Sequence, residues 1–122
     1  MPFWRGGGNI LAKACSNVVY KLQDVMIVET TDEFDHWLRR LKDRQARGRI
    51  LDRIARLRDR GHFGDVRTVG GAVREMRINI GPGYRLYFVQ RGTTVVVLLC
   101  GGDKGSQDRD IAAAKSLAEG LD

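Results

Sequence analysis

The sequence predicts an α+β domain in which an N-terminal helical hairpin packs on a mostly antiparallel sheet of about four to five strands, followed by a C-terminal helix. Apolar residues recur at three- and four-residue spacing before Gly61, alternate with a period of two after it, and return to helical spacing after Ser106. With 122 residues, of which 43% are hydrophobic, the chain can build one core and is too short for two domains of ordinary size.

The first elements begin after a stretch with no clear pattern. Residues 1–25 carry a triple glycine and no hydrophobic period, so we expect a loose extension in front of a domain that spans residues 26–122. Residues 25–30, "VMIVET", indicate a short strand. Thr30 and Glu33 then predict a capping box that starts a helix. The apolar face of this helix is formed by Phe34, Trp37, Leu38 and Leu41.

A second helix is expected from about Arg44 to Arg60, with Gly61 as a left-handed C-cap. Its predicted buried stripe consists of Ile50, Leu51, Ile54 and Leu57. The outer face of the helical hairpin is strongly basic, with Arg39, Arg40, Lys42, Arg44, Arg47, Arg49, Arg53, Arg56, Arg58 and Arg60 against only Asp43, Asp52 and Asp59. This face is either a solvated surface with some i, i+4 ion pairs or a cationic surface for an RNA backbone, bound without sequence choice.

Strands are expected near residues 65–69, 72–80, 84–91 and 93–100, where Gly, Thr and Val are enriched. A glycine loop follows, and Ser106 is the expected N-cap of the closing helix. The apolar face of that helix is formed by Ile111, Ala114, Leu117 and Ala118.

The hairpin "EMRINIGPGYRLYF" combines apolar and charged residues. If Gly81-Pro82-Gly83 closes the hairpin, Ile80 pairs with Tyr84, and Asn79 lies opposite Arg85. Alternation then places one set of side chains in the core, namely Met76, Ile78, Ile80, Tyr84, Leu86 and Phe88. The other, polar face carries Glu75, Arg77, Asn79, Arg85, Tyr87 and Val89. These arginines either keep a wet sheet face solvated or bind phosphates beside a stacking surface, as single-stranded RNA requires.

Charge and composition narrow the class of protein. The net charge of +6 and a pI of about 9.8 suggest an anionic partner, and few of the basic residues lie in the extension. The two cysteines form no disulfide framework, which fits a reducing cytoplasm, and Cys100 ends an apolar run, as a core residue would. His36 and His62 have no metal-ligand spacing, and no apolar run is long enough to span a membrane, so we expect no metal, no cofactor and no membrane partner.

From Met26 to Ala118 the chain resembles the RelE/ParE toxin superfamily, most closely its HigB-like branch of addiction module killer proteins. The segments that carry the resemblance are "REMRI" (74–78), "GPGYRLYF" (81–88) and "LLCGGDKGSQDRDIAAA" (98–114). The resemblance implies a RelE-like fold and the cytoplasmic toxin of a type II toxin–antitoxin pair. It also implies a small helix-turn-helix antitoxin as partner, in a hetero-oligomer with the toxin. RelE- and HigB-like members cut mRNA on the ribosome, whereas ParE-like members inhibit DNA gyrase.

The resemblance and the hairpin together suggest a metal-independent endoribonuclease, or mRNA interferase. Arg85, Arg77 and Lys104 match basic positions of the family, although Glu75 stands where RelE-type chains carry a lysine. Arg85 and Arg77 would neutralise the phosphorane, Lys104 would assist the leaving group, and Tyr87 would stack on or position a base. Glu75 is either a general base or the salt-bridge partner of Arg74 or Arg77. The expected RNA-binding residues are Arg74, Asn79, Arg44, Arg47, Arg53, Arg56 and Arg60. The alternative is a non-catalytic protein: a gyrase inhibitor, or a decayed toxin that acts only in repression with its antitoxin.

Overall fold

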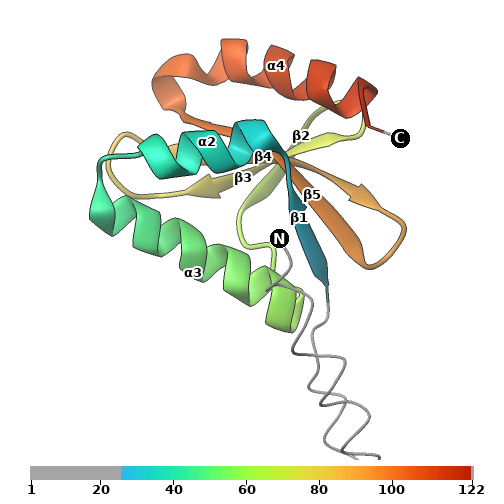
Figure 1. The fold of residues 1–122 in the computed structure, drawn as a ribbon, viewed down its shortest axis with the longest axis horizontal. Helices are drawn as coiled ribbons and strands as arrows, with labels where there is room; N and C mark the ends of the chain where they lie inside the picture. The colour runs from blue at the N-terminus through green and yellow to red at the C-terminus, as the bar shows by residue number, and fades with distance from the viewer. Residues whose placement is uncertain (1–25, 122) are drawn as a thin grey trace, which may run out of the picture.

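The computed structural model describes residues 26–121, and the extension expected at residues 1–25 lies outside the described residues. The predicted α+β class is confirmed. One five-stranded sheet carries the two helices of the hairpin, α2 (Asp32–Arg40) and α3 (Arg44–Arg60), on one face and α4 (Gln107–Glu119) on the other (Figure 1). No helix within residues 26–121 is long and apolar enough to cross a bilayer.

The sheet is mostly antiparallel, as predicted. Its strands are β1 (Ile27–Thr30), β2 (Val66–Gly70), β3 (Val73–Ile78), β4 (Tyr84–Arg91) and β5 (Val95–Asp103). Their order across the sheet is β1-β5-β4-β3-β2, and β1 pairs with β5 in parallel while the other pairs are antiparallel. The expected strands are all present, but β3 ends earlier than predicted, at Ile78, and β5 runs on to Asp103.

The helix α2 starts one residue later than the capping box predicted. Its N-cap is Thr31, whose hydroxyl accepts a hydrogen bond from the Phe34 N–H at 3.0 Å. Thr30 cannot take this position because it remains in β1, paired with Leu98 of β5. The predicted Thr30 cap is therefore wrong by one residue, although the helix itself is confirmed.

The helix α3 ends at Gly61, which adopts a φ of 68°, so the predicted left-handed C-cap is confirmed. Its buried residues are Ala46, Ile50, Ile54 and Leu57. Leu51 is 41% exposed, and its predicted burial is wrong. Successive residues of a helix are rotated by about 100°, so Leu51 points well away from the stripe that contains its neighbour Ile50.

The two faces of the sheet are covered by different helices, and each has its own hydrophobic core. The core under α2 and α3 contains Met76, Ile78, Tyr84, Leu86, Phe88, Val96 and Leu98 from the sheet. The core under α4 contains Val73, Tyr87, Val89, Val97, Leu99 and Cys100 from the sheet, with Ala114 from the helix. The hairpin face that the sequence predicted to be wet is therefore largely covered by α4, because that helix supplies a second apolar layer.

Two adjacent glycines near the end of β5 allow helices to approach from both sides. A side chain at Gly101 would collide with the ring of Trp37 in α2, and one at Gly102 would collide with the carboxylate of Asp110 in α4. Ser106 stands at the N-cap of α4, as predicted, but its hydroxyl makes no capping bond and donates instead to that same carboxylate. The glycine pair therefore seats the start of α4 against the sheet.

Candidate functional site

The β3–β4 hairpin has a different register from the predicted one. Ile78, not Ile80, is paired with Tyr84, and residues 79–83 form the loop. The Ile80 N–H donates to the Ile78 carbonyl at 2.9 Å and the Gly83 N–H donates to the Ile80 carbonyl at 3.0 Å, so a tight turn removes Ile80 from the ladder. Because the shift is two residues, the strand residues keep their predicted faces while their partners change.

The corrected register brings the two sheet arginines, Arg77 and Arg85, directly opposite each other on adjacent strands. Like charges in such a pair repel, so the pair needs a counter-charge. Glu75 supplies it. Its Oε1 lies 3.1 Å from Arg77 Nε, which donates a hydrogen bond to it, and its Oε2 lies 3.6 Å from Arg85 Nε.

Glu75 is 1% exposed and is the centre of a hydrogen-bond network. Besides the bond from Arg77, it accepts one from the Tyr87 hydroxyl at 3.0 Å and one from Gln107 Nε2 at 2.8 Å. Burial by itself would raise the pKa of Glu75, but the hydrogen bonds from Gln107, Arg77 and Tyr87 and the charge of Arg85 outweigh it and lower that pKa. Glu75 is therefore an anion at neutral pH and a weak base.

This geometry decides between the two interpretations of Glu75. The salt bridge to Arg77 is present, whereas Arg74 lies on the other face of the strand, with its guanidinium 5.4 Å and 5.6 Å from the ring centres of Phe63 and Phe88. A structural ion pair, not a free base, is what the structure shows at position 75. Arg74, a predicted RNA contact, lies apart from the sheet arginines because its side chain is on the other face of β3.

Tyr87 is fully buried, so its predicted role as a stacking surface is wrong for this structure. Its ring packs in the core under α4, and its hydroxyl donates to Glu75. Burial, reinforced by the hydrogen bond and the charge of Glu75, raises the pKa of Tyr87 above its ordinary value. Tyr87 therefore remains a neutral hydrogen-bond donor that positions Glu75.

The sheet arginines differ in exposure. The side chain of Arg77 is 21% exposed and that of Arg85 is 9% exposed, so the prediction that both emerge freely from the sheet is wrong for Arg85. Arg85 Nη1 donates to the Gly83 carbonyl at 2.8 Å, which holds the guanidinium against the hairpin loop. Its Nε makes no hydrogen bond within residues 26–121. Arg77 is thus the more accessible member of the pair, and Arg85 is the more buried one, with its Nε 3.6 Å from Glu75.

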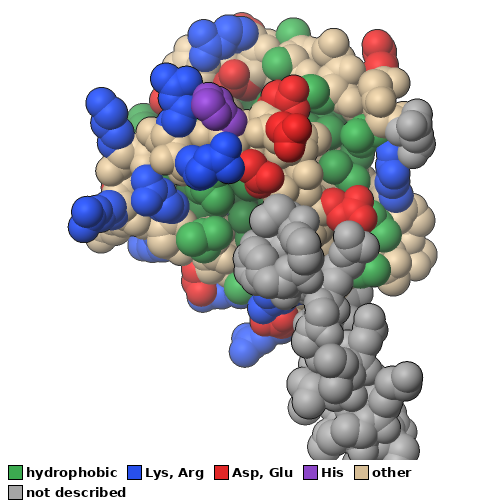
Figure 2. Space-filling view, in the orientation of Figure 1, with side chains coloured by type: hydrophobic (Ala, Val, Ile, Leu, Met, Phe, Trp, Pro, Cys, Tyr) green, Lys and Arg blue, Asp and Glu red, His purple; other side chains and the backbone are tan. Residues whose placement is uncertain are grey.

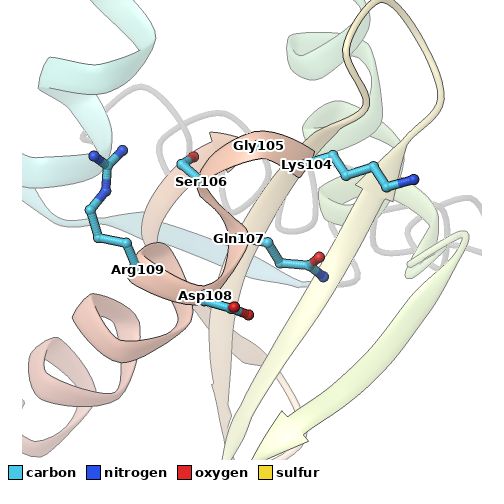
Figure 3. Close-up of a pocket in the computed structure, with 6 residues that line it drawn as sticks. All are labelled: Lys104, Gly105, Ser106, Gln107, Asp108 and Arg109. Carbon is cyan, nitrogen blue, oxygen red and sulfur yellow. The ribbon is translucent and has the colours of Figure 1, made fainter.

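Lys104 approaches the sheet arginines through the loop after β5. It starts the short 3-10 turn η2 (Lys104–Ser106) and is exposed. A Cβ placed on Gly83 would lie 3.1 Å from Arg85 Nη1 and 3.8 Å from the Cβ of Lys104, so the start of this turn packs beside the hairpin loop and near Arg85. The turn borders a hollow of about 380 Å³ lined by residues 104–109 (Figure 3). Lys104 and Gln107 extend to one side of it, and Arg109 extends to the other.

Gln107 is the residue of this site that the sequence did not reveal. Its side chain crosses from the first turn of α4 to Glu75, thirty-two positions earlier in the chain. A glutamine in the first turn of a helix is unremarkable in spacing and composition, so no local pattern distinguishes it. Its partner becomes evident only when α4 docks on the sheet.

The predicted RNA-binding residues of α3 fall into two groups. Arg47 donates to the Leu41 carbonyl, and Arg53 donates to two other carbonyls, so both are committed to the protein itself. The exposed group consists of Arg44, Arg56 and Arg60. Lys and Arg side chains gather over α2 and α3 on the left of the view in Figure 2, while acidic side chains gather nearer its middle. Asn79 is also exposed, but in the hairpin loop and not opposite Arg85 as predicted.

The fold and the site define the class: an α+β protein with a RelE-like arrangement and a paired set of arginines on its sheet. Residues 36–119 match the family described as "Phage derived protein Gp49-like (DUF891)". The chain belongs to this Gp49-like family, which is related to addiction-module toxins, so the resemblance is confirmed at that level. The match is to Gp49-like proteins and not directly to RelE or HigB proteins.

The chain is also similar to a curated protein whose role is not described. An uncharacterized protein of Haemophilus influenzae strain Rd is 47% identical over 94 residues, which cover 77% of this chain and 94% of the relative. No solved structure matches the chain. No group of three or more His, Cys, Asp or Glu side chains within residues 26–121 is placed to hold a metal ion.

Proposed function

We propose that this chain is the cytoplasmic toxin of a type II toxin–antitoxin pair and that it cleaves mRNA on the ribosome without a metal or cofactor. Membership of the Gp49-like family supports the toxin class. The observation that carries the RNA assignment is the pairing of Arg77 with Arg85, held by one buried carboxylate and flanked by Lys104. Such a fixed pair of guanidinium groups is suited to a phosphate.

The chemistry follows from RNA itself. Metal-free cleavage uses the 2′-hydroxyl as nucleophile, and the protein must stabilise the extra negative charge on the pentavalent phosphorus. In this proposal Arg77 contacts the phosphorane, Arg85 adds positive charge from the adjacent strand, and Lys104 donates a proton to the departing 5′-oxygen. The proton of the 2′-hydroxyl passes to solvent water, because Glu75 is held as the counter-ion of the arginines. Arginine remains protonated because its pKa is above about 12, so its contribution is electrostatic. Glu75, Tyr87 and Gln107 position the sheet arginines.

The test is induction of the chain in the absence of any antitoxin, followed by mapping of mRNA 5′ ends. We expect new ends inside translated codons, and a loss of cleavage rate of about 10²–10³-fold in Arg77→Ala. Arg91→Ala is the matched control, because Arg91 is exposed at the far end of β4. Full cleavage by Arg77→Ala would remove the sheet arginines from the proposed site.

A non-catalytic protein is the second candidate, and the burial of Glu75 and Tyr87 favours it. A general base at Glu75 and a stacking surface at Tyr87 would each have to reach the RNA, and both side chains are buried on the face that α4 covers. A gyrase inhibitor would leave mRNA intact and block replication. A toxin that acts only in repression would leave growth unaffected and still bind operator DNA together with its antitoxin.

The proposed partner is a small helix-turn-helix antitoxin, encoded beside this chain and bound to it in a hetero-oligomer. Co-expression of the neighbouring reading frame with the tagged chain tests it. Copurification and relief of growth inhibition are expected, and toxicity unchanged by every neighbouring frame would contradict the pairing.

A further inference from the structure

A second hollow, of about 340 Å³, lies between α3 and the hairpin loop, and the function proposed above does not use it. It is lined by Arg49, Asp52, Arg53, Arg56, Ile78 and Asn79. Its three helix arginines, Arg49, Arg53 and Arg56, follow one another at spacings of four and three and so share one face of α3. We call this feature the α3 hollow. The core under α2 and α3 adjoins it, so it lies across β3 from the sheet arginines.

Arg53 is fixed at the back of the α3 hollow by two carbonyl groups. Its Nη1 donates to the Arg77 carbonyl and its Nη2 to the Phe63 carbonyl, each at 2.8 Å. The ladder between β2 and β3 ends at Val66 and Met76, so the Arg77 carbonyl lies beyond it and takes its hydrogen bond from Arg53 instead. Arg53 therefore contributes a fixed positive charge to the lining, and the exposed Arg49 and Arg56 supply the contacts with a ligand.

A glycine makes this arrangement possible. Gly64 has a φ of 73°, and any side chain there would overlap the guanidinium of Arg53. The loop before β2 therefore closes around the arginine and cannot easily accept another residue at that position.

The charge of the α3 hollow is only partly compensated. Arg53 is bonded to neutral carbonyls, and burial, partly offset by Asp65 and reinforced by Arg56, lowers its pKa. The lining carboxylate, Asp52, is 3.4 Å from Arg56, and both side chains are 59% exposed. Arg49 is exposed and makes no ion pair within the described residues. Three lining cations thus face one lining carboxylate that is already paired and a second carboxylate, Asp65, that acts on Arg53, so a net positive charge remains and favours an added anion.

We propose that the α3 hollow binds a backbone phosphate of single-stranded RNA, as a second contact for the strand that meets Arg77. This inference rests on the proposed function. Guanidinium forks match the oxygen geometry of a phosphate, and the Asn79 amide adds a neutral donor from the loop. Arg53 bonds the Arg77 backbone, and Asn79 follows Arg77 by two residues, so the α3 hollow lies at the same end of β3 as the sheet arginines, although on the opposite face of the sheet. An extended strand that passes around the hairpin loop would contact both sites, and this favours RNA over an acidic protein segment.

The experiment measures binding of the purified chain to a fluorescently labelled single-stranded RNA by anisotropy, over a series of salt concentrations. The test variant is Arg49→Gln/Arg56→Gln, which leaves the strut Arg53 in place. The control is Arg91→Gln/Lys115→Gln, which removes the same charge from exposed positions outside the α3 hollow. Each lost contact with single-stranded RNA should reduce the slope of log K against log salt by about 0.7, so the test variant should lose about 1.4 and the control none. Equal slopes for the test and control variants would overturn the proposal.

Further measurements test the neutral contact and the occupant, and a comparison of cleavage with binding separates failure of this proposal from failure of the proposed function. Asn79→Ala should weaken binding without changing the salt slope, because the amide is neutral. If Arg77→Gln abolishes cleavage while the test variant binds RNA like the control, the α3 hollow is excluded and the cleavage site stands. If the test variant loses the slope while Arg77→Gln still cleaves, the α3 hollow stands and the cleavage site fails. Preferential binding of poly-glutamate over RNA would assign the hollow to an acidic protein and overturn the proposal. Circular dichroism of each variant verifies the fold.

Discussion

The sheet arginines and the helix arginines carry the same charge, yet the fold treats them differently. Arg77 and Arg85 share a carboxylate that is 1% exposed, so one of their two positive charges is balanced inside the protein before any ligand arrives. The helix arginines rely on carbonyls, solvent and one exposed ion pair. A count of basic residues therefore does not show which of them bind a partner; burial and the nature of each partner do.

Among the variants considered, removal of the shared carboxylate of Glu75 should reduce the free energy of unfolding the most. Glu75→Ala leaves two opposed guanidinium groups and the donors of Tyr87 and Gln107 without an acceptor, which should cost about 3–5 kcal/mol of unfolding free energy. Urea denaturation measures it. Asp52→Ala is the control, since that carboxylate is exposed and should matter by less than about 1 kcal/mol. Similar losses in the two variants would contradict the buried network.

Arg53 should be the exception among the helix arginines. Arg53→Met leaves the carbonyls of Arg77 and Phe63 without their donor and should destabilise the chain by about 1–3 kcal/mol. Arg49→Met should change stability by less than about 0.5 kcal/mol because Arg49 is exposed. Chemical denaturation of both variants tests the difference, and equal stability would show that the two carbonyl bonds contribute nothing.

The dependence of stability on pH should sharpen the comparison. The pKa of Glu75 is lowered in the folded chain, so its stabilising effect is complete above the unfolded value of about 4.3 and is lost as the pH falls through the lower folded value. We expect Glu75→Gln to be less stable than the wild-type chain at pH 7 and to lose less stability between pH 5 and pH 3. The measurement is the free energy of unfolding of both proteins as a function of pH. An equal loss for the two proteins between pH 5 and pH 3 would contradict a lowered pKa at Glu75.

The smallest effect is expected at the exposed pair of α3. Asp52→Asn removes the ion pair with Arg56, whose partners are 3.4 Å apart and 59% exposed, and should cost about 0.2–1 kcal/mol at low salt. Added salt should remove the difference because exposed charges are screened. A loss that persists at high salt would show that Asp52 acts in another way.

The sequence predicted the order of helices and strands because hydrophobic period and caps such as Gly61 are local properties. The pairing of residues across the hairpin was predicted wrongly, because two hydrogen bonds inside the turn remove Ile80 from the β-ladder. The spacing of residues in the sequence does not indicate these hydrogen bonds. The polar face of β3 and β4 was expected to be wet because alternation cannot reveal whether a distant helix will cover it. The network of Glu75 with Gln107 depends on that docking, so the site was predicted in its arginines but not in their support.

At its two adjacent glycines, β5 has no side chain on either face of the sheet. The helices α2 and α4 therefore contact its backbone directly, from opposite sides. A methyl group at Gly101 would tilt the helical hairpin against Trp37, whereas one at Gly102 would lift the start of α4 and draw Gln107 away from Glu75. The two neighbouring positions thus set the distance of different helices from the sheet, Gly101 that of α2 and Gly102 that of α4. The contact between Gln107 and the buried carboxylate therefore depends on the absence of a side chain at Gly102.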